Sequence, residues 1–176
     1  VARAFEEMVT VGLVPDTPWK IYSAQAAGSA PVVNALHRES DLIEPVKPNT
    51  IAKSIAIGNP ADGYAVLKAV RKSGGWGEKA TDDEIVAGIK LLAETEGIFT
   101  EPAGGTTVAV TKKLIDQGRI PRDESIVISV TGNGYKTLEA VMASVVTPSV
   151  INARLSDFDA LYEKLGCAPS AAAGSR

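Results

Sequence analysis

Cysteine, histidine and aromatic residues are scarce in this sequence of 176 residues. The single cysteine, Cys167, excludes an internal disulfide and a metal site built from several thiolates. The single histidine, His37, excludes a metal site made of several histidines. Aromatic residues make up only 5%, which argues against a surface that stacks nucleic-acid bases. These features are consistent with a protein of a reducing compartment.

The chain also has little net charge and no long apolar run. Its formal net charge is −3, so we expect binding neither to nucleic acid nor to a membrane surface. No apolar run approaches the roughly 20 residues that span a bilayer, and we recognise no secretory leader. We therefore expect a cytoplasmic protein. Hydrophobic residues make up 45%, as in ordinary globular domains.

The sequence opens with VARAFEEM, without an initiator methionine. Phe5, Met8 and Val9 recur at helical spacing and predict a helix at the start of the chain. The segment Gly12–Lys20 contains two prolines and predicts a loop. Because the chain starts inside an amphipathic segment, we expect it to be a piece of a longer polypeptide.

Strand-forming and helix-forming segments alternate along the chain, which predicts an α/β fold with a mostly parallel sheet flanked by helices. Thr81 and Glu84 form a T-x-x-E capping box before an apolar stripe, and Gly97 is expected to end this helix. Ser125–Val130 consists mainly of strand formers and predicts a strand buried on both faces. The remaining expected segments are strands near 21–28, 54–57 and 98–100, and helices over 29–40 (capped by Ser29), 61–75, 105–117, 135–145 and from 156.

Three expected strands end in small-residue turns followed by helix starts, in SIAIGNPADG, IFTEPAGGTT and VISVTGNGYK. The carboxyl ends of parallel strands share one edge of a sheet, so we expect the three turns to face one ligand. Glycine lets the backbone approach a flat ring or a phosphate closely. None of the turns matches a dinucleotide-binding or P-loop motif. Each turn alone is also what any α/β protein needs, so a purely structural turn remains the alternative.

Four phrases in a fixed order carry a resemblance to a known family: YSAQAAGSAP, SIAIGNPADG, EPAGG and VTGNGYK. Together they resemble the C-terminal half of the threonine synthases, which are fold type II pyridoxal-phosphate (PLP) enzymes. The similarity covers most of residues 20–138. The chain departs from the family pattern at Gly104–Gly105, where Ser-Ala is usual, and at Tyr135 and Thr137, where Leu and Asp are usual. The resemblance implies that residues 1–166 are the C-terminal portion of a PLP-dependent large domain, followed by a flexible tail over 167–176.

The resemblance also implies a cofactor site. In the family, the threonine of the T-G-N-G phrase contacts the pyridine nitrogen of PLP, which corresponds to Thr131. A hydroxyl cannot hold a proton on that nitrogen as a carboxylate would, and Gly132 would let the chain turn sharply beneath the ring. We expect Glu101 to line the cofactor, and Ile57 and Gly58 to pack beside the ring. The alternatives are a helix-capping threonine, a carboxylate placed on a helix dipole and an ordinary turn.

The remaining polar and ionisable residues are weaker candidates. Gln25 and Ser29 belong to one of the four phrases and are retained as minor candidates. His37 is expected on the surface of a helix. Lys136 follows the glycines, but the Schiff-base lysines of the family lie far upstream, so we expect a lysine on a helix surface. Cys167 is expected to be incidental.

The resemblance implies that PLP-dependent chemistry converts O-phospho-L-homoserine and water into L-threonine and phosphate. We find neither a phrase for a Schiff-base lysine nor a loop for the PLP phosphate. We therefore expect the N-terminal half of the enzyme as a partner, and no catalysis by this chain alone. Members of the family are often dimers, which makes a homodimer an expected assembly. The alternatives are another fold type II enzyme, such as a threonine or serine dehydratase or a β-replacing synthase, and a non-catalytic α/β module.

Overall fold

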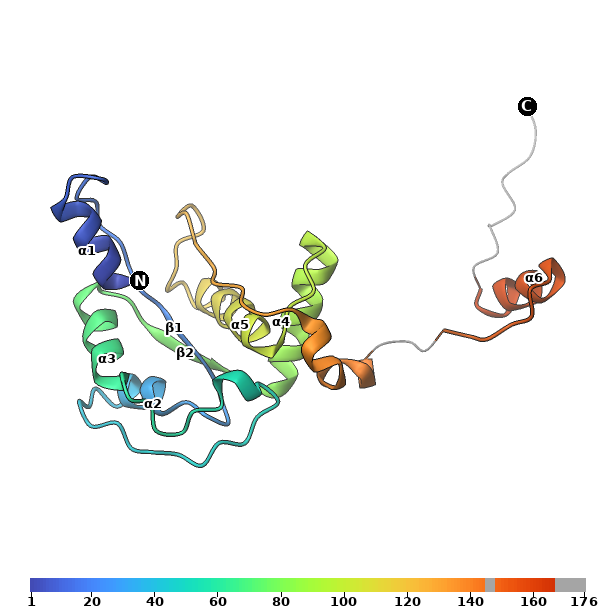
Figure 1. Cartoon of the computed structure of the whole chain (residues 1–176), viewed down its shortest axis with the longest axis horizontal. Helices are drawn as coiled ribbons and strands as arrows, with labels where there is room; N and C mark the ends of the chain where they lie inside the picture. Colours follow the sequence, from blue (N-terminus) through green and yellow to red (C-terminus); the bar gives the residue numbers. More distant parts are fainter. Residues whose placement is uncertain (145–147, 167–176) are drawn as a thin grey trace. The chain divides into compact units, whose positions relative to one another are not determined.

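The structure is a computed structural model that describes residues 1–144 and 148–166. The chain divides into two units, Val1–Ala143 and Ser144–Arg176. The first unit contains a small parallel sheet with helices on both of its sides (Figure 1). The second unit contains α6, Leu155–Lys164. The predicted α/β class is confirmed.

The sheet consists of β1, Ser23–Ala26, and β2, Gly77–Ala80, which run parallel from the pair Ser23–Gly77 to the pair Ala26–Ala80. Strand β1 was predicted from the sequence. Strand β2 was not, because its sequence GEKA contains no β-branched or aromatic residue. Its strand conformation comes from pairing with β1 and from helix α5, Pro102–Asp116, which packs against both strands.

Helices α4, Asp82–Glu96, and α5 cross closely at glycines. A Cβ atom on Gly105 would lie 2.5 Å from Ile89 Cγ1, and one on Gly88 would lie 2.4 Å from the carbonyl oxygen of Gly105. Only a residue without a side chain fits at this crossing. The larger core cluster lies here, between the sheet, α4 and α5; its buried members are Ala26, Ala52, Ala80, Ile85, Ile89, Val110, Leu114, Ile120 and Val141.

Helices α2, Pro31–His37, and α3, Gly63–Lys72, form the second cluster. The proline at the first position of α2 was predicted, but the prediction that Ser29 caps this helix is wrong. The N-cap is Ala30, and the Ser29 hydroxyl is buried without a hydrogen-bond partner in the described part of the chain. The buried residues of this cluster are Val32, Ala35, Leu36, Leu67 and Val70.

The capping box of α4 is present as predicted. The Thr81 hydroxyl accepts from the Glu84 N–H at 3.3 Å, and the Glu84 carboxylate accepts from the Thr81 N–H at 2.8 Å. Gly97 ends the helix with φ +67°, a left-handed conformation that glycine adopts without strain.

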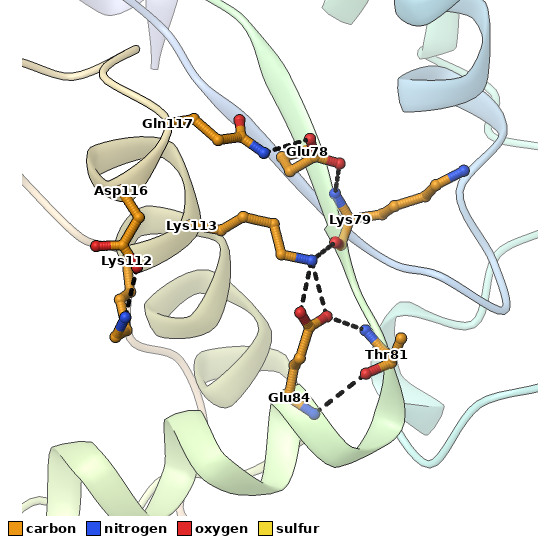
Figure 2. Close-up of polar contacts among 8 residues, drawn as sticks. All are labelled: Glu78, Lys79, Thr81, Glu84, Lys112, Lys113, Asp116 and Gln117. Carbon is orange, nitrogen blue, oxygen red and sulfur yellow. Dashed lines mark hydrogen bonds and ion pairs between the residues drawn. The ribbon is translucent and has the colours of Figure 1, made fainter.

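Lys113 of α5 ties this helix start to the sheet, as Figure 2 shows. Its Nζ atom lies 2.8 Å from the Glu84 carboxylate and 2.9 Å from the carbonyl oxygen of Lys79 at the end of β2. The hydrogen bond from Lys113 lowers the pKa of Glu84, and the N–H of Thr81 adds to this effect. One ammonium group therefore fixes β2, α4 and α5 relative to one another.

The predicted buried strand Ser125–Val130 is wrong for this chain. The segment forms no β pairing in the structure, and Val127 is 95% exposed. A strand needs a neighbour for its backbone groups, and the described sheet contains only β1 and β2, which pair with each other. A hydrogen bond of 3.2 Å from the Thr107 hydroxyl to the carbonyl of Ser129 holds the segment beside α5.

Two shorter strand predictions also differ from the structure. The expected extended piece at 54–57 is instead a 3₁₀ turn, η1, Lys53–Ile55. The Thr50 hydroxyl accepts from the N–H of Ala52 at 3.2 Å and compacts the chain just before this turn. The expected strand at 98–100 is reduced to an isolated antiparallel bridge between Thr100 and Asn133.

The helix predicted over 135–145 forms as 3₁₀ turns: η2, Gly134–Ala140, and η3, Met142–Ser144. Thr137, with φ −144° and ψ 48°, interrupts the helical conformation. Val145 lies outside the described residues.

The ends of the described chain agree with the sequence patterns. Helix α1, Ala2–Thr10, and the loop after it were predicted, and the ring of Phe5 stacks on that of Trp19 at 5.8 Å. Helix α6 was predicted as well. The tail over 167–176 lies outside the described residues. None of the helices in the described part of the chain is long and apolar enough to cross a membrane.

Candidate functional site

The second predicted turn, Glu101–Gly105, is wrong, because Pro102–Gly105 already form the first residues of α5. This helix start and the third predicted turn are nevertheless neighbours in the structure. We call residues 131–134 the Thr131 turn. The N–H of Glu101 donates to the carbonyl of Gly132 at 3.3 Å, and the N–H of Gly134 donates to the carbonyl of Phe99 at 3.1 Å. The EPAGG and VTGNG phrases therefore meet through backbone hydrogen bonds. The predicted reason, a shared edge of parallel strands, is wrong, because the two segments meet at the isolated antiparallel bridge between Thr100 and Asn133 and neither belongs to the described sheet.

A buried threonine, Thr100, contacts the backbone of the Thr131 turn. Thr100 is 1% exposed, and its hydroxyl oxygen lies 3.4 Å from the carbonyl oxygen of Thr131 and 3.2 Å from that of Gly132. A Cβ atom on Gly104 would lie 2.0 Å from this hydroxyl oxygen, so glycine at 104 leaves room for the contact. Thr100 could not be recognised as a site residue from the sequence, because a threonine at the end of an apolar run carries no motif of its own.

Gly132 is required by two independent features of the turn. Its φ is +73°, a conformation that strains residues with a side chain. A Cβ atom at this position would lie 2.1 Å from Glu101 Oε1 and 2.3 Å from Glu101 Cδ. The carboxylate of Glu101 thus fills the space directly beneath the turn.

Glu101 is a buried carboxylate at the start of α5. It is the N-cap of that helix but makes no side-chain capping bond. It is 6% exposed, and its Oε2 atom lies 3.4 Å from Lys136 Nζ. The positive end of the helix dipole and the ammonium both favour a negative charge here. Lys136 is exposed, as predicted, but its ion pair with Glu101 was not predicted. The only sequence signal for this pair was a positive charge directly after the VTGNG phrase.

Thr131 lies at the surface of this arrangement. It is exposed, and its hydroxyl makes no hydrogen bond to any group of the described residues. Its carbonyl is held by Thr100 while its side chain is unengaged. An exposed hydroxyl on a turn held by backbone hydrogen bonds can donate to, or accept from, a bound molecule.

Gly58, next to Ile57, contacts the segment around Val46 and not the Thr131 turn. Gly58 accepts at its carbonyl from the N–H of Val46 at 3.0 Å, and a Cβ on Gly58 would lie 1.9 Å from the carbonyl oxygen of Val46. Ile57 is 56% exposed. No hydrogen bond among the described residues joins these two residues to the Thr131 turn, so their place beside the same ligand stays a prediction.

The minor candidates have structural partners. The Gln25 side-chain oxygen accepts from the N–H of Val33 at 2.9 Å, within the first turn of α2. His37 is exposed, as predicted; its Nε2 lies 2.9 Å from the carbonyl oxygen of Gly77, and its ring stacks on Trp76. Cys167 lies outside the described residues.

A hollow of about 660 Å³ lies between α4 and α5, away from the Thr131 turn. Gly88, Leu91 and Lys113 are among its lining residues, but Glu101 and Thr131 are not. The described residues also contain no cluster of histidine, cysteine and carboxylate groups that could hold a metal ion. In the Thr131 turn, residues 131–133 are exposed and Gly134 is buried.

Comparison with known proteins finds a matching family model and several similar proteins. Residues 1–132 match the family model of the pyridoxal-phosphate dependent enzymes. The threonine synthase of Methanocaldococcus jannaschii is 39% identical over 164 residues, which are 93% of this chain and 40% of that protein. The threonine synthase of Mycobacterium bovis is 36% identical over 167 residues, which are 94% of this chain and 43% of that protein. The structure of maize serine racemase superposes with a TM-score of 0.44 and 18% identity, over 58% of this chain and 30% of that one.

The chain thus spans less than half the length of the curated relatives that it matches. The matched region is their C-terminal part.

Proposed function

The chain belongs to the pyridoxal-phosphate dependent enzymes, and we propose that it is the C-terminal part of a threonine synthase. The proposed reaction converts O-phospho-L-homoserine and water into L-threonine and phosphate. One observation carries the proposal: the EPAGG and VTGNG phrases meet through the hydrogen bond from Glu101 to Gly132, beside the unengaged hydroxyl of Thr131. The identities of 39% and 36% to proteins named threonine synthase support the same reaction.

The residues of the Thr131 turn suit the pyridine edge of PLP. The ring nitrogen is a hydrogen-bond acceptor, and the Thr131 hydroxyl is a free donor at an exposed position. The backbone at Gly132 has no side chain that would keep a flat ring at a distance. When bound, PLP supplies an electron sink for carbanions of the substrate. Thr131 would orient the ring without placing a proton on its nitrogen, because a hydroxyl is too weak an acid.

Glu101 and the residues of the first turn complete the proposed surface. Glu101 would line the site from beneath the turn, where its carboxylate already contacts Gly132. Ile57 and Gly58 would pack beside the ring in the assembled enzyme. The 56% exposure of Ile57 leaves its apolar side chain available for such a contact.

The proposal includes a second polypeptide segment. The Schiff-base lysine and the loop for the PLP phosphate would come from the part of the enzyme that this chain does not match, so the chain alone would be inactive. The exposed strand formers of residues 125–130 support this partner. An unpaired apolar strand segment gains both backbone partners and burial when a neighbouring strand is supplied. A cytoplasmic location and a homodimer are part of the same proposal.

A chimeric enzyme tests the reaction. The matched C-terminal part of the Methanocaldococcus jannaschii threonine synthase is replaced by residues 1–166 of this chain, and products are measured from O-phospho-L-homoserine. We expect threonine and phosphate in equal amounts. Thr131→Ala should lower the rate about tenfold, as the loss of one hydrogen bond predicts, whereas Thr131→Ser should retain most of it.

Two results of this experiment would contradict the proposal. A keto acid and ammonia as products would indicate a dehydratase instead. A folded chimera that takes up no PLP would indicate that the turns of this chain are only structural.

A further inference from the structure

An ion pair lies directly behind the Thr131 turn. The Nζ atom of Lys136 is 3.4 Å from Oε2 of Glu101. The Glu101 side chain is 8% exposed and that of Lys136 is 64% exposed, so the lysine reaches from solvent to a buried carboxylate. Among the residues that the structure describes, Lys136 is the only lysine, arginine or histidine within ion-pair distance of Glu101.

The two partners come from the two segments that form the site. Lys136 lies in η2, immediately after the turn, and its N–H donates to the carbonyl of Asn133 at 3.2 Å. Glu101 lies at the start of α5, and its N–H donates to the carbonyl of Gly132. The ion pair therefore clamps the turn between the chain that follows it and the helix beneath it.

The position of the carboxylate affects the turn directly. The Oε1, Cδ and Cγ atoms of Glu101 occupy the space 2.1 to 2.8 Å from where a Cβ of residue 132 would lie. If the side chain moved away, the backbone at Gly132 would lose its support from below. A buried carboxylate without its cation is unfavourable and moves toward water where it can.

We propose that Lys136 is a positioning residue that holds the Glu101 carboxylate beneath Gly132 and so fixes the turn that presents Thr131. The proposal rests on the proposed function for the identity of the ligand. The coupling between Lys136, Glu101 and the turn is independent of the proposed function. Lys136 acts through Glu101 and takes no part in covalent chemistry.

Hydrogen exchange in the 176-residue chain, without cofactor, tests the coupling. The amides of Glu101 and Gly134 are the reporters, because both donate across the junction of the two segments. Lys136→Met, which removes the charge but keeps the apolar stem, should speed their exchange about fivefold. Lys136→Arg should remain within about twofold of the wild type. The amide of Ile85, which donates to the carbonyl of Thr81 in the first turn of α4, is the internal reference and should not change.

Two further variants separate a specific clamp from a general effect of charge. In a Glu101→Gln background, Lys136→Met should have no additional effect, because the carboxylate that it holds is gone. Lys112→Met removes an exposed ion pair with Asp116 on the surface of α5 and should leave both reporters unchanged. Equal exchange in Lys136→Met and wild type, or an undiminished effect of Lys136→Met in the Glu101→Gln background, would overturn the proposal. Faster exchange at Ile85 as well would also overturn it, because the effect would be global.

The chimeric enzyme provides the second readout. Lys136→Met should weaken PLP affinity about fivefold and shift the visible absorption band of the bound cofactor, and Lys136→Arg should restore both. If the wild-type chimera bound no PLP while the exchange pattern held, the proposed function would fail and the clamp would stand. If PLP bound normally and Lys136→Met changed neither exchange nor absorption, the clamp would fail and the proposed function would stand.

Discussion

Large aliphatic side chains are buried in one region of this chain and exposed in another. Ile85, Ile89 and Leu114, in α4 and α5, are at most 1% exposed. The strand formers of 125–130 are exposed, and Val127 reaches 95%. Helices satisfy their backbone groups internally, so α4 and α5 bury their apolar faces against each other and the nearby sheet. A strand depends on the backbone of a neighbouring strand. Residues 125–130 pair with no strand among the described residues, so their apolar side chains stay exposed.

The largest effect is expected in the buried region. Ile89→Ala removes a side chain at the crossing of α4 and α5 and should lower the free energy of unfolding by about 2–5 kcal/mol. Urea denaturation followed by circular dichroism measures this loss. A loss below about 1 kcal/mol would mean that the crossing is not the tightly packed core described here.

The Thr131 turn should respond next most strongly. Gly132→Ala places a side chain at φ +73° and against Glu101, and should cost about 1–3 kcal/mol. Gly97→Ala is the matched control, because Gly97 has φ +67° but no atom within 4 Å of its added Cβ. Thermal unfolding should show a larger loss for Gly132→Ala. Equal losses would mean that the contact with Glu101 contributes nothing.

The Lys113 contact should contribute a smaller, pH-dependent amount. Because the pKa of Glu84 is lowered by Lys113 from 4.5, its stabilisation is present above that value and is lost as pH falls through the lowered pKa. Lys113→Met should cost at most about 1 kcal/mol at pH 7, because both side chains are partly exposed. The difference between wild type and variant should shrink as the pH falls below 4.5. A difference that stays constant down to pH 2 would assign the effect to lost packing instead.

The smallest effect is expected at the exposed strand formers. Val127→Ser should change the stability of the chain alone by less than about 0.5 kcal/mol, because the side chain makes no buried contact to lose. In the chimera, the same change should destabilise by more, if a neighbouring strand covers this segment. Parallel denaturation of the two proteins measures the contrast. An equal effect in both would remove the support that this segment gives to the proposed N-terminal partner.

The sequence predicted those elements whose signals are local. Thr81, Glu84 and Gly97 set both ends of α4 because capping bonds involve residues within one turn of the helix. Strand β2 could not be predicted, because GEKA becomes a strand only through β1. The strand predicted at 125–130 failed for the converse reason. Its residues favour a strand, but its pairing depends on a neighbour far away in the sequence or on another segment.

The residues of the site were predictable from the sequence, but several of their contacts were not. Glu101, Thr131 and Gly132 were predicted to face one ligand, and they lie close together. The predicted reason was wrong, because the two segments meet at an isolated antiparallel bridge and not at a shared edge of parallel strands. The support from Thr100 and the ion pair of Lys136 could not be read from the sequence, because both depend on how closely two distant segments approach. The place of Ile57 and Gly58 beside the same ligand stays a prediction, which the chimeric enzyme would test.

The most direct test of the central claim, that this chain is one side of a two-part PLP site, is intact-mass analysis after borohydride reduction. The 176-residue chain is co-purified with the unmatched N-terminal part of a threonine synthase and incubated with PLP. After reduction, the mass of each polypeptide is measured. We predict that the reduced cofactor is attached to the N-terminal polypeptide, and that Thr131→Ala in this chain lowers the labelled fraction. Cofactor attached stoichiometrically to a lysine of this chain, or labelling of the N-terminal part that is the same with and without this chain, would contradict the account.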